Sequence, residues 1–178
     1  FAVLAVGFGP CSTLSTLPPR PLLTQGHGSR ATPEVGALSA APAFDNLGDH
    51  HRTISTYLPQ AQRYFDQGLR LMFAFNLEEA ERSFRAAVAI DPTCAICSWG
   101  VALALGPHIN FPATPERTVA ANAAAAEALR RAGSVTPVER ALIEALATRY
   151  SGSADHRVSN DQAYADAMRA VHTRFPAD

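Results

Sequence analysis

Residues 61–92 read AQRYFDQGLRLMFAFNLEEAERSFRAAVAIDP, and this stretch decides the fold. Its small and bulky residues are spaced by twelve, four, three and five positions, at Gly68, Ala80, Phe84, Ala87 and Pro92. Apolar residues three, four or seven apart predict two amphipathic helices, over residues 59–75 and 77–90, with Asn76 between them. Small side chains at the helix crossing would let the two helices approach closely, with Phe84 beside them. Such a hairpin cannot bury its apolar face alone, so the pattern predicts stacking on neighbouring hairpins.

The sequence after Pro92 predicts four more helices. Thr114 with Pro115, and the capping box from Thr136 to Glu139, are typical of helix starts. The predicted helices cover residues 94–105, 115–132, 137–150 and 161–175. The expected fold is all-α, an antiparallel helix-pair solenoid of about six helices, with repeats near 61–94, 95–133 and 136–178. Five aromatic residues are assigned to helix packing or the core: Tyr64, Phe65, Phe73, Phe75 and Trp99.

The two ends of the chain carry separate predictions. Residues 1–9 form an apolar run too short to span a bilayer, and they suit the tail of a secretory signal peptide. Pro, Ser, Thr, Gly and Ala dominate the stretch that follows, so we predict a signal-peptide remnant and disordered linker over 1–46 and a helical domain over 47–178. The protein would then be periplasmic or secreted, and otherwise cytoplasmic. The last helix has an apolar face that needs a further helix, which indicates the N-terminal fragment of a longer solenoid.

Composition narrows the class of protein. The chain has 178 residues, of which 47% are apolar and 17% charged, enough for one folded domain with a real core. A formal net charge of −1 gives no reason to expect nucleic acid or an anionic membrane as partner. The sequence has no nucleotide-binding glycine loop, Ser-His-Asp order or paired-carboxylate signature. We therefore predict no enzymatic activity and no cofactor.

The sharpest chemical candidate is the pair Cys94 and Cys97, three residues apart at a predicted helix start. They are interpreted as small buried packing residues, as a structural or redox-labile disulfide, or as metal-binding or catalytic thiols. The sequence lacks both the βαβ context of a dithiol oxidoreductase and a second CxxC for zinc. His50, His51 and His108 could supply nitrogen ligands, although their spacing is not diagnostic. His108 lies in an inter-helix loop longer than a standard repeat has.

Several motifs together resemble one protein family. They are residues 61–69, Phe75-Asn76 with Ala80, Asp91-Pro92 with Cys94, Trp99-Gly100, and Gly106-Pro107 with Asn110. Over about residues 47–178 the chain resembles a group of longer bacterial tetratricopeptide-repeat proteins, whose unit is a helix-turn-helix of 34 residues. It departs from that group at Leu77, where His is frequent, and at Leu58, where Ser usually precedes the helix proline. The resemblance implies an interaction scaffold without enzymatic activity.

The expected partner is a protein or peptide segment held in a concave groove lined by the first helix of each pair. Arg63, Gln67 and Arg70, between the core positions of the first helix, are the candidate contacts, with His108 as a weaker one. One alternative is a metal- or redox-linked module that uses Cys94, Cys97 and nearby histidines. Another is a domain that packs against a missing C-terminal enzyme domain. The sequence does not indicate an oligomeric state.

Overall fold

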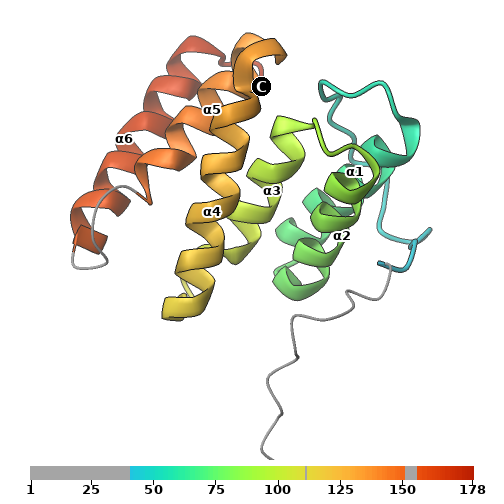
Figure 1. Cartoon of the computed structure of the whole chain (residues 1–178), viewed down its shortest axis with the longest axis horizontal. Helices are drawn as coiled ribbons and strands as arrows, with labels where there is room; N and C mark the ends of the chain where they lie inside the picture. Colours follow the sequence, from blue (N-terminus) through green and yellow to red (C-terminus); the bar gives the residue numbers. More distant parts are fainter. Residues whose placement is uncertain (1–40, 111, 151–155) are drawn as a thin grey trace, which may run out of the picture. The chain divides into compact units, whose positions relative to one another are not determined.

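The computed structural model describes residues 41–110, 112–150 and 156–178, which belong to one compact unit. This part of the chain is all-α (Figure 1). Its helices are α1 (Pro59–Phe73), α2 (Leu77–Ile90), α3 (Ala95–Leu105), α4 (Pro115–Arg131), α5 (Pro137–Thr148) and α6 (Arg157–Arg174), with a 3₁₀ turn η1 (Ala132–Ser134) after α4. The prediction of an all-α fold with six helices is confirmed. Residues 1–40, which hold most of the predicted signal-peptide remnant and linker, lie outside the described residues.

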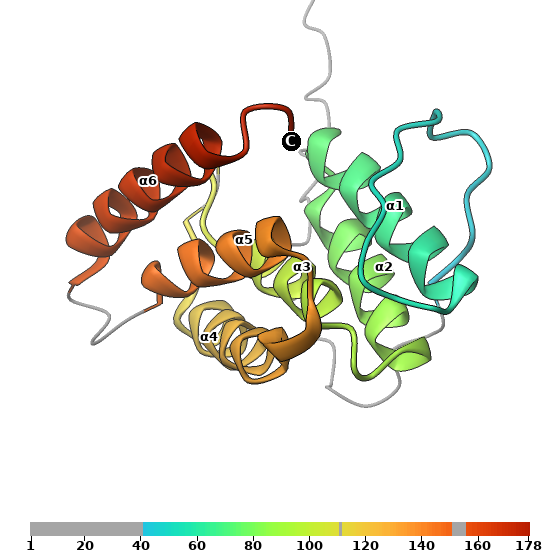
Figure 2. The same cartoon turned by 90° about the horizontal axis from the view of Figure 1, so that it is seen from above.

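Consecutive helices pack in pairs, as the sequence predicted. α1 packs on α2, α3 on α4 and α5 on α6, and the second helix of each pair also meets the first helix of the next (Figures 1 and 2). In the part of the chain that the structure describes, no helix is long and apolar enough to cross a membrane.

Local signals explain most of the helix boundaries. α2 has the predicted bounds, and the predicted capping box forms at the start of α5, where Thr136 and Glu139 bond reciprocally. α6 begins at Arg157, four residues before the predicted start at Asp161. An ion pair between Arg157 Nε and Asp161 Oδ2, at 2.6 Å, joins these two residues across the first turn and favours the earlier start.

Phe84 occupies the joint between the first two helix pairs. Its side chain is fully buried, and it packs against Gly68 of α1 as predicted. It also packs against Gly100 of α3, a contact that the sequence analysis missed. A β-carbon on either glycine would overlap the phenyl ring, at 2.6 Å for Gly68 and 2.4 Å for Gly100. Glycine is therefore required at both positions for the three helices to meet around one ring.

The assignment of Phe73 and Phe75 to helix packing is wrong, because their side chains are 67% and 66% exposed. α1 ends at Phe73, and the chain then reverses through a Schellman motif. The Asn76 N–H donates to Leu71 O at 2.9 Å, and the Phe75 N–H donates to Met72 O at 3.1 Å. Phe75, with φ 59°, takes the left-handed position of this motif. The reversal points both aromatic rings away from the core.

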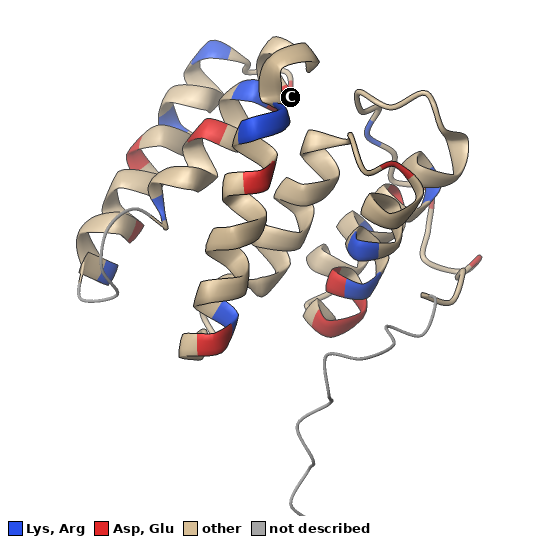
Figure 3. Cartoon of the chain, in the orientation of Figure 1, with Lys and Arg blue, Asp and Glu red and all other residues tan. Residues whose placement is uncertain are grey.

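Basic and acidic side chains are interspersed along the helices (Figure 3). All fifteen basic residues are arginines. Several pair with a carboxylate one turn away, such as Arg82 with Glu79 and Arg85 with Glu81, each at 2.8 Å. Pairs of this kind add only a few tenths of a kcal/mol each and keep the helix surface soluble.

Candidate functional site

The residues before α1 form an irregular loop beside that helix, which bends at Gly48 and returns to the N-terminus of α1 (Figures 1 and 2). We call residues 41–56 the strap. Its contacts with α1 begin at Ala41, six residues before the predicted start of the helical domain at Leu47. Ala41 and Ile54 are its buried apolar residues, and Phe44 and Leu47 pack against the core with part of their surface exposed. The strap is therefore part of the folded domain.

Gln67, one of the predicted partner contacts, holds the first half of the strap. Its amide oxygen accepts a hydrogen bond from the Phe44 N–H at 2.8 Å. Its amide nitrogen donates to Pro42 O at 2.8 Å and to Ser83 Oγ at 2.9 Å. The side chain is 3% exposed, so it lies beneath the strap and is not available on the surface. Gln67 thus binds the strap through two of its backbone groups.

Arg63 and Arg70, the other two predicted contacts on α1, also face the strap. Arg63 Nη2 pairs with Asp45 Oδ1 at 2.7 Å, on the exposed side of the segment. Arg70 Nε donates to the backbone oxygen of His50 at 2.8 Å. The structure therefore brings all three α1 residues named from the sequence together, on a face that the chain's own strap covers.

Gln62 and Asp66, which the sequence analysis did not single out, hold the middle of the strap. Asp66 Oδ1 accepts from the Arg52 N–H at 3.1 Å, and Asp66 Oδ2 lies 2.7 Å from Nδ1 of His51. Gln62 donates to Arg52 O at 2.8 Å and accepts from the Ile54 N–H at 3.0 Å. Side chains of one helix thus satisfy three backbone groups of the strap, the N–H and C=O of Arg52 and the N–H of Ile54, much as a neighbouring strand would.

Two further carboxylates hold the end of the strap. Glu139, in the first turn of α5, accepts from the Ser55 N–H at 2.7 Å and from the Ser55 hydroxyl. Its side chain is 1% exposed, and it also completes the α5 capping box. Asp91, at the end of α2, accepts from the Thr56 hydroxyl at 2.6 Å. The strap therefore bridges from α1 to the first helix of the third pair.

Hydrogen bonds stabilise the ionised carboxyl of Asp91 in this position. Burial alone would raise its pKa, but hydrogen bonds from Thr56 and Thr93 outweigh burial and lower the pKa below 3.8. Asp91 is consequently an anion at neutral pH, and its charge favours hydroxyl and N–H donors. It acts here as a hydrogen-bond acceptor for the strap.

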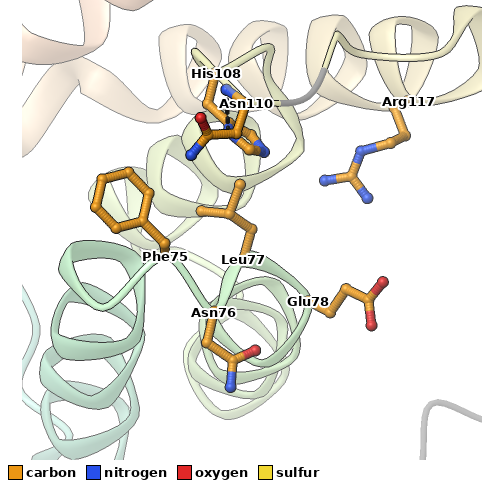
Figure 4. A pocket seen from close by; sticks show the side chains of 7 residues that line it. All are labelled: Phe75, Asn76, Leu77, Glu78, His108, Asn110 and Arg117. Atoms are coloured by element: carbon orange, nitrogen blue, oxygen red, sulfur yellow. Dashed lines mark hydrogen bonds between the residues drawn. The ribbon is translucent and has the colours of Figure 1, made fainter. Parts of the chain in front are cut away.

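His108 lies apart from the strap, in the wall of a pocket of about 390 Å³ (Figure 4). The pocket is formed by the α1–α2 turn, the α3–α4 loop and the first turn of α4, and is lined by Phe75, Asn76, Leu77, Glu78, His108, Asn110 and Arg117. His108 Nδ1 accepts from the Asn110 N–H at 3.3 Å. Phe75 lies at one end of the pocket, and Glu78 and Arg117 lie at the other. The site is apolar at one end and charged at the other.

Cys94 and Cys97 are joined by a disulfide at the start of α3. Both residues are buried, and Cys94 Sγ accepts from the Cys97 N–H at 3.2 Å as the helix cap. His108 lies past the opposite end of α3, about 16 Å along an eleven-residue helix. Over residues 41–110, 112–150 and 156–178, no three His, Cys, Asp or Glu side chains are grouped so as to hold a metal ion. The structure does not bring the predicted cysteine–histidine set together.

Asp66 and Glu139 are the strap contacts with the clearest sequence signal that we overlooked. Each is a carboxylate set among core positions, directly after Phe65 and three residues before Leu142. A charged residue in the apolar stripe of a helix is buried only when it has partners.

Comparison of the chain with protein-family models, with curated proteins and with solved structures finds no match.

Proposed function

We propose that this protein is a non-enzymatic interaction scaffold, in which paired helices hold an extended segment of another polypeptide. One observation carries the proposal: α1 binds an extended segment chiefly through that segment's backbone. Gln62, Asp66 and Gln67 together contact five backbone groups between Pro42 and Ile54. Backbone-directed binding by side chains is the chemistry of a peptide-recognition surface.

The resemblance to tetratricopeptide-repeat proteins supports the same proposal. In such repeats the first helix of each pair would line a concave groove for a partner. Most of the buried strap contacts come from α1 and α5, which are the first helices of the first and third pairs; Asp91, at the end of α2, is the exception. A metal- or redox-linked module has less support, because Cys94 and Cys97 form a buried disulfide and His108 lies beyond the other end of α3.

A peptide-display library panned against the immobilised full chain tests the proposal. We expect a family of related peptides to be enriched and to bind the soluble protein saturably in fluorescence anisotropy. Arg130→Ala, on the exposed side of α4, should bind these peptides as the wild type does. Enrichment no greater than on heat-denatured protein, or binding that does not saturate, would overturn the proposal.

A further inference from the structure

We propose that the strap can be displaced from the face of α1 that it covers. A segment of a partner protein then binds to this face in place of the strap. The inference rests on the proposed function and adds the location and chemistry of the partner site. It commits to one occupant, a partner segment that matches the strap in chemistry. Exchange of straps between two copies of this chain is an outcome that the test distinguishes.

The first argument is that most strap contacts do not depend on the strap's own sequence. The amide groups of Phe44, Arg52 and Ile54 donate to α1 side chains, and that of Ser55 donates to Glu139. The carbonyls of Pro42, His50 and Arg52 accept from α1 side chains. These groups belong to every polypeptide backbone, so a partner segment that follows the same path, with a bend at the position of Gly48 (φ 80°), can make the same bonds.

The second argument is that the surface beneath the strap is polar. The side chains that the strap satisfies are Gln62, Asp66, Gln67, Asp91 and Glu139. Water can satisfy all five when the strap leaves, because hydrated carboxylates and amides carry no penalty for an unmet hydrogen bond. The strap also contributes four apolar side chains to the core: Ala41 and Ile54 are buried, and Phe44 and Leu47 are partly buried.

The third argument concerns the junction with α1. Tyr57 is fully exposed, and Leu58, the N-cap of α1, is also exposed and makes no side-chain capping bond. Neither residue gives α1 a side-chain capping bond or a buried contact. The chain can therefore change direction at these two residues without a loss of contacts there. Pro59 fixes the helix start independently of the strap, because its backbone is already set for the first helical position.

The charges along the face define the partner segment. Arg63 faces Asp45 near the start of the strap, and Asp66 faces His51 further along. Glu139 and Asp91, at the far end, accept from the hydroxyls of Ser55 and Thr56. The matching segment is extended and carries an acidic residue first, then a basic residue or histidine, then an apolar residue followed by two hydroxyl residues.

The test uses a fluorescent peptide of the strap sequence, residues 41–57, added to the full chain. The tethered strap competes at high effective concentration, so the wild type should bind this peptide weakly. Ile54→Ala or Ser55→Ala loosens the tethered strap, and we expect each to bind the peptide at least about tenfold more tightly. Asn46→Ala, at an exposed position of the strap, is the matched control and should behave as the wild type. A peptide with Ser55→Pro, which lacks the N–H bonded to Glu139, should not bind.

Hydrogen exchange of the wild type gives a second readout that needs no variant. We expect the amides of Arg52, Ile54 and Ser55 to exchange at least about tenfold faster than those of α3, through local opening of the strap. Exchange at the same rate as α3 would overturn the proposal. So would equal peptide binding by Ile54→Ala, Ser55→Ala and Asn46→Ala.

Two further outcomes separate this inference from the proposed function. If Ile54→Ala formed a concentration-dependent dimer in which two copies exchange straps, the α1 face would bind a second copy of this chain. That result would overturn the proposed partner site. Library peptides that bind the protein without competing with the strap peptide would leave the scaffold function standing while overturning this site. Absence of any peptide binding would overturn both.

Discussion

The phenyl ring of Phe84 lies so close to the α-carbon of Gly100 that no side chain fits between them. A β-carbon at residue 100 would lie 2.4 Å from Cδ1 of the ring, well inside van der Waals contact. Because Phe84 comes from α2 and Gly100 from α3, this contact sets how closely the second helix pair approaches the first. The geometry of the stack depends on it.

Gly100→Ala should destabilise the fold by about 1–3 kcal/mol, because the added methyl group overpacks a buried joint. Urea unfolding followed by circular dichroism measures the effect. Gly133→Ala is the matched control, since a β-carbon there meets nothing within 4 Å, and it should change stability by less than about 0.5 kcal/mol. Phe84→Leu should recover part of the loss in the Gly100→Ala background. Equal urea midpoints for both glycine variants would contradict the packing argument.

Reduction of the Cys94–Cys97 bond should lower the free energy of unfolding by about 2 kcal/mol, a small value because the bond closes a very short loop. Thermal unfolding with and without reductant measures it, and Cys94→Ser should reproduce the reduced value. Cys11→Ser is the control, because that residue takes no part in this bond. In the native protein neither Cys94 nor Cys97 should react with a thiol reagent; two reactive thiols without reductant would refute the bond.

Tyr150 should resist ionisation. Burial raises its pKa to about 12, and its hydroxyl donates to Ala102 O at 2.9 Å. A pKa raised above the ordinary value of 10.0 means that folding favours the neutral phenol. The associated stability is therefore complete below pH 10 and is lost as the pH rises toward 12. Ultraviolet titration of the phenolates should show a late step for Tyr150 near pH 12.

Tyr57→Phe, at a fully exposed position, is the control in that titration and should leave the late step unchanged. Tyr150→Phe should remove the late step and cost about 1 kcal/mol at neutral pH, through loss of one buried hydrogen bond. An unchanged late step in Tyr150→Phe would assign it to another tyrosine, such as Tyr164, whose pKa burial also raises.

Phe75→Gly should stabilise the protein by about 1 kcal/mol, because Phe75 holds the left-handed position of a Schellman motif with an exposed ring. Phe73→Gly is the matched control: it also removes an exposed aromatic side chain, but from helical backbone, so it should destabilise by about 0.5–1 kcal/mol. Thermal unfolding of the two variants gives the comparison. A loss of stability in Phe75→Gly would show that its ring makes a compensating contact.

The helices could be predicted from local signals in the sequence, whereas the strap could not. α2 was predicted to the residue because a turn precedes it and Asp91-Pro92 ends it. Phe73 and Phe75 were misassigned because periodicity shows which residues share a helix face and does not show where the helix ends. The strap contacts join residues 8 to 126 positions apart, such as Ile54 with Gln62 and Arg52 with Asp178. An extended segment bound through its backbone leaves no side-chain pattern to find.

The candidate site was predicted in part. Arg63, Gln67 and Arg70 were chosen as exposed residues between the core positions of the first helix; the structure places all three against the strap, with Gln67 buried beneath it. Binding of a separate partner there stays a prediction. The capping motif predicted one role of Glu139 and did not predict the other. The same carboxylate also accepts hydrogen bonds from Ser55, which lies 84 positions earlier in the sequence.

The link from Ser55 to Glu139 also bears on how the protein unfolds. In a stack of helical hairpins each unit meets only its neighbours, so the terminal units can fray one at a time. Here the strap shares a hydrogen-bonded carboxylate with the third hairpin, and an ion pair of 2.8 Å ties Arg52 to Asp178. Fraying of the third hairpin therefore removes contacts of the strap, and opening of the strap removes contacts of the third hairpin. The same long sequence separations slow folding, because they must close last.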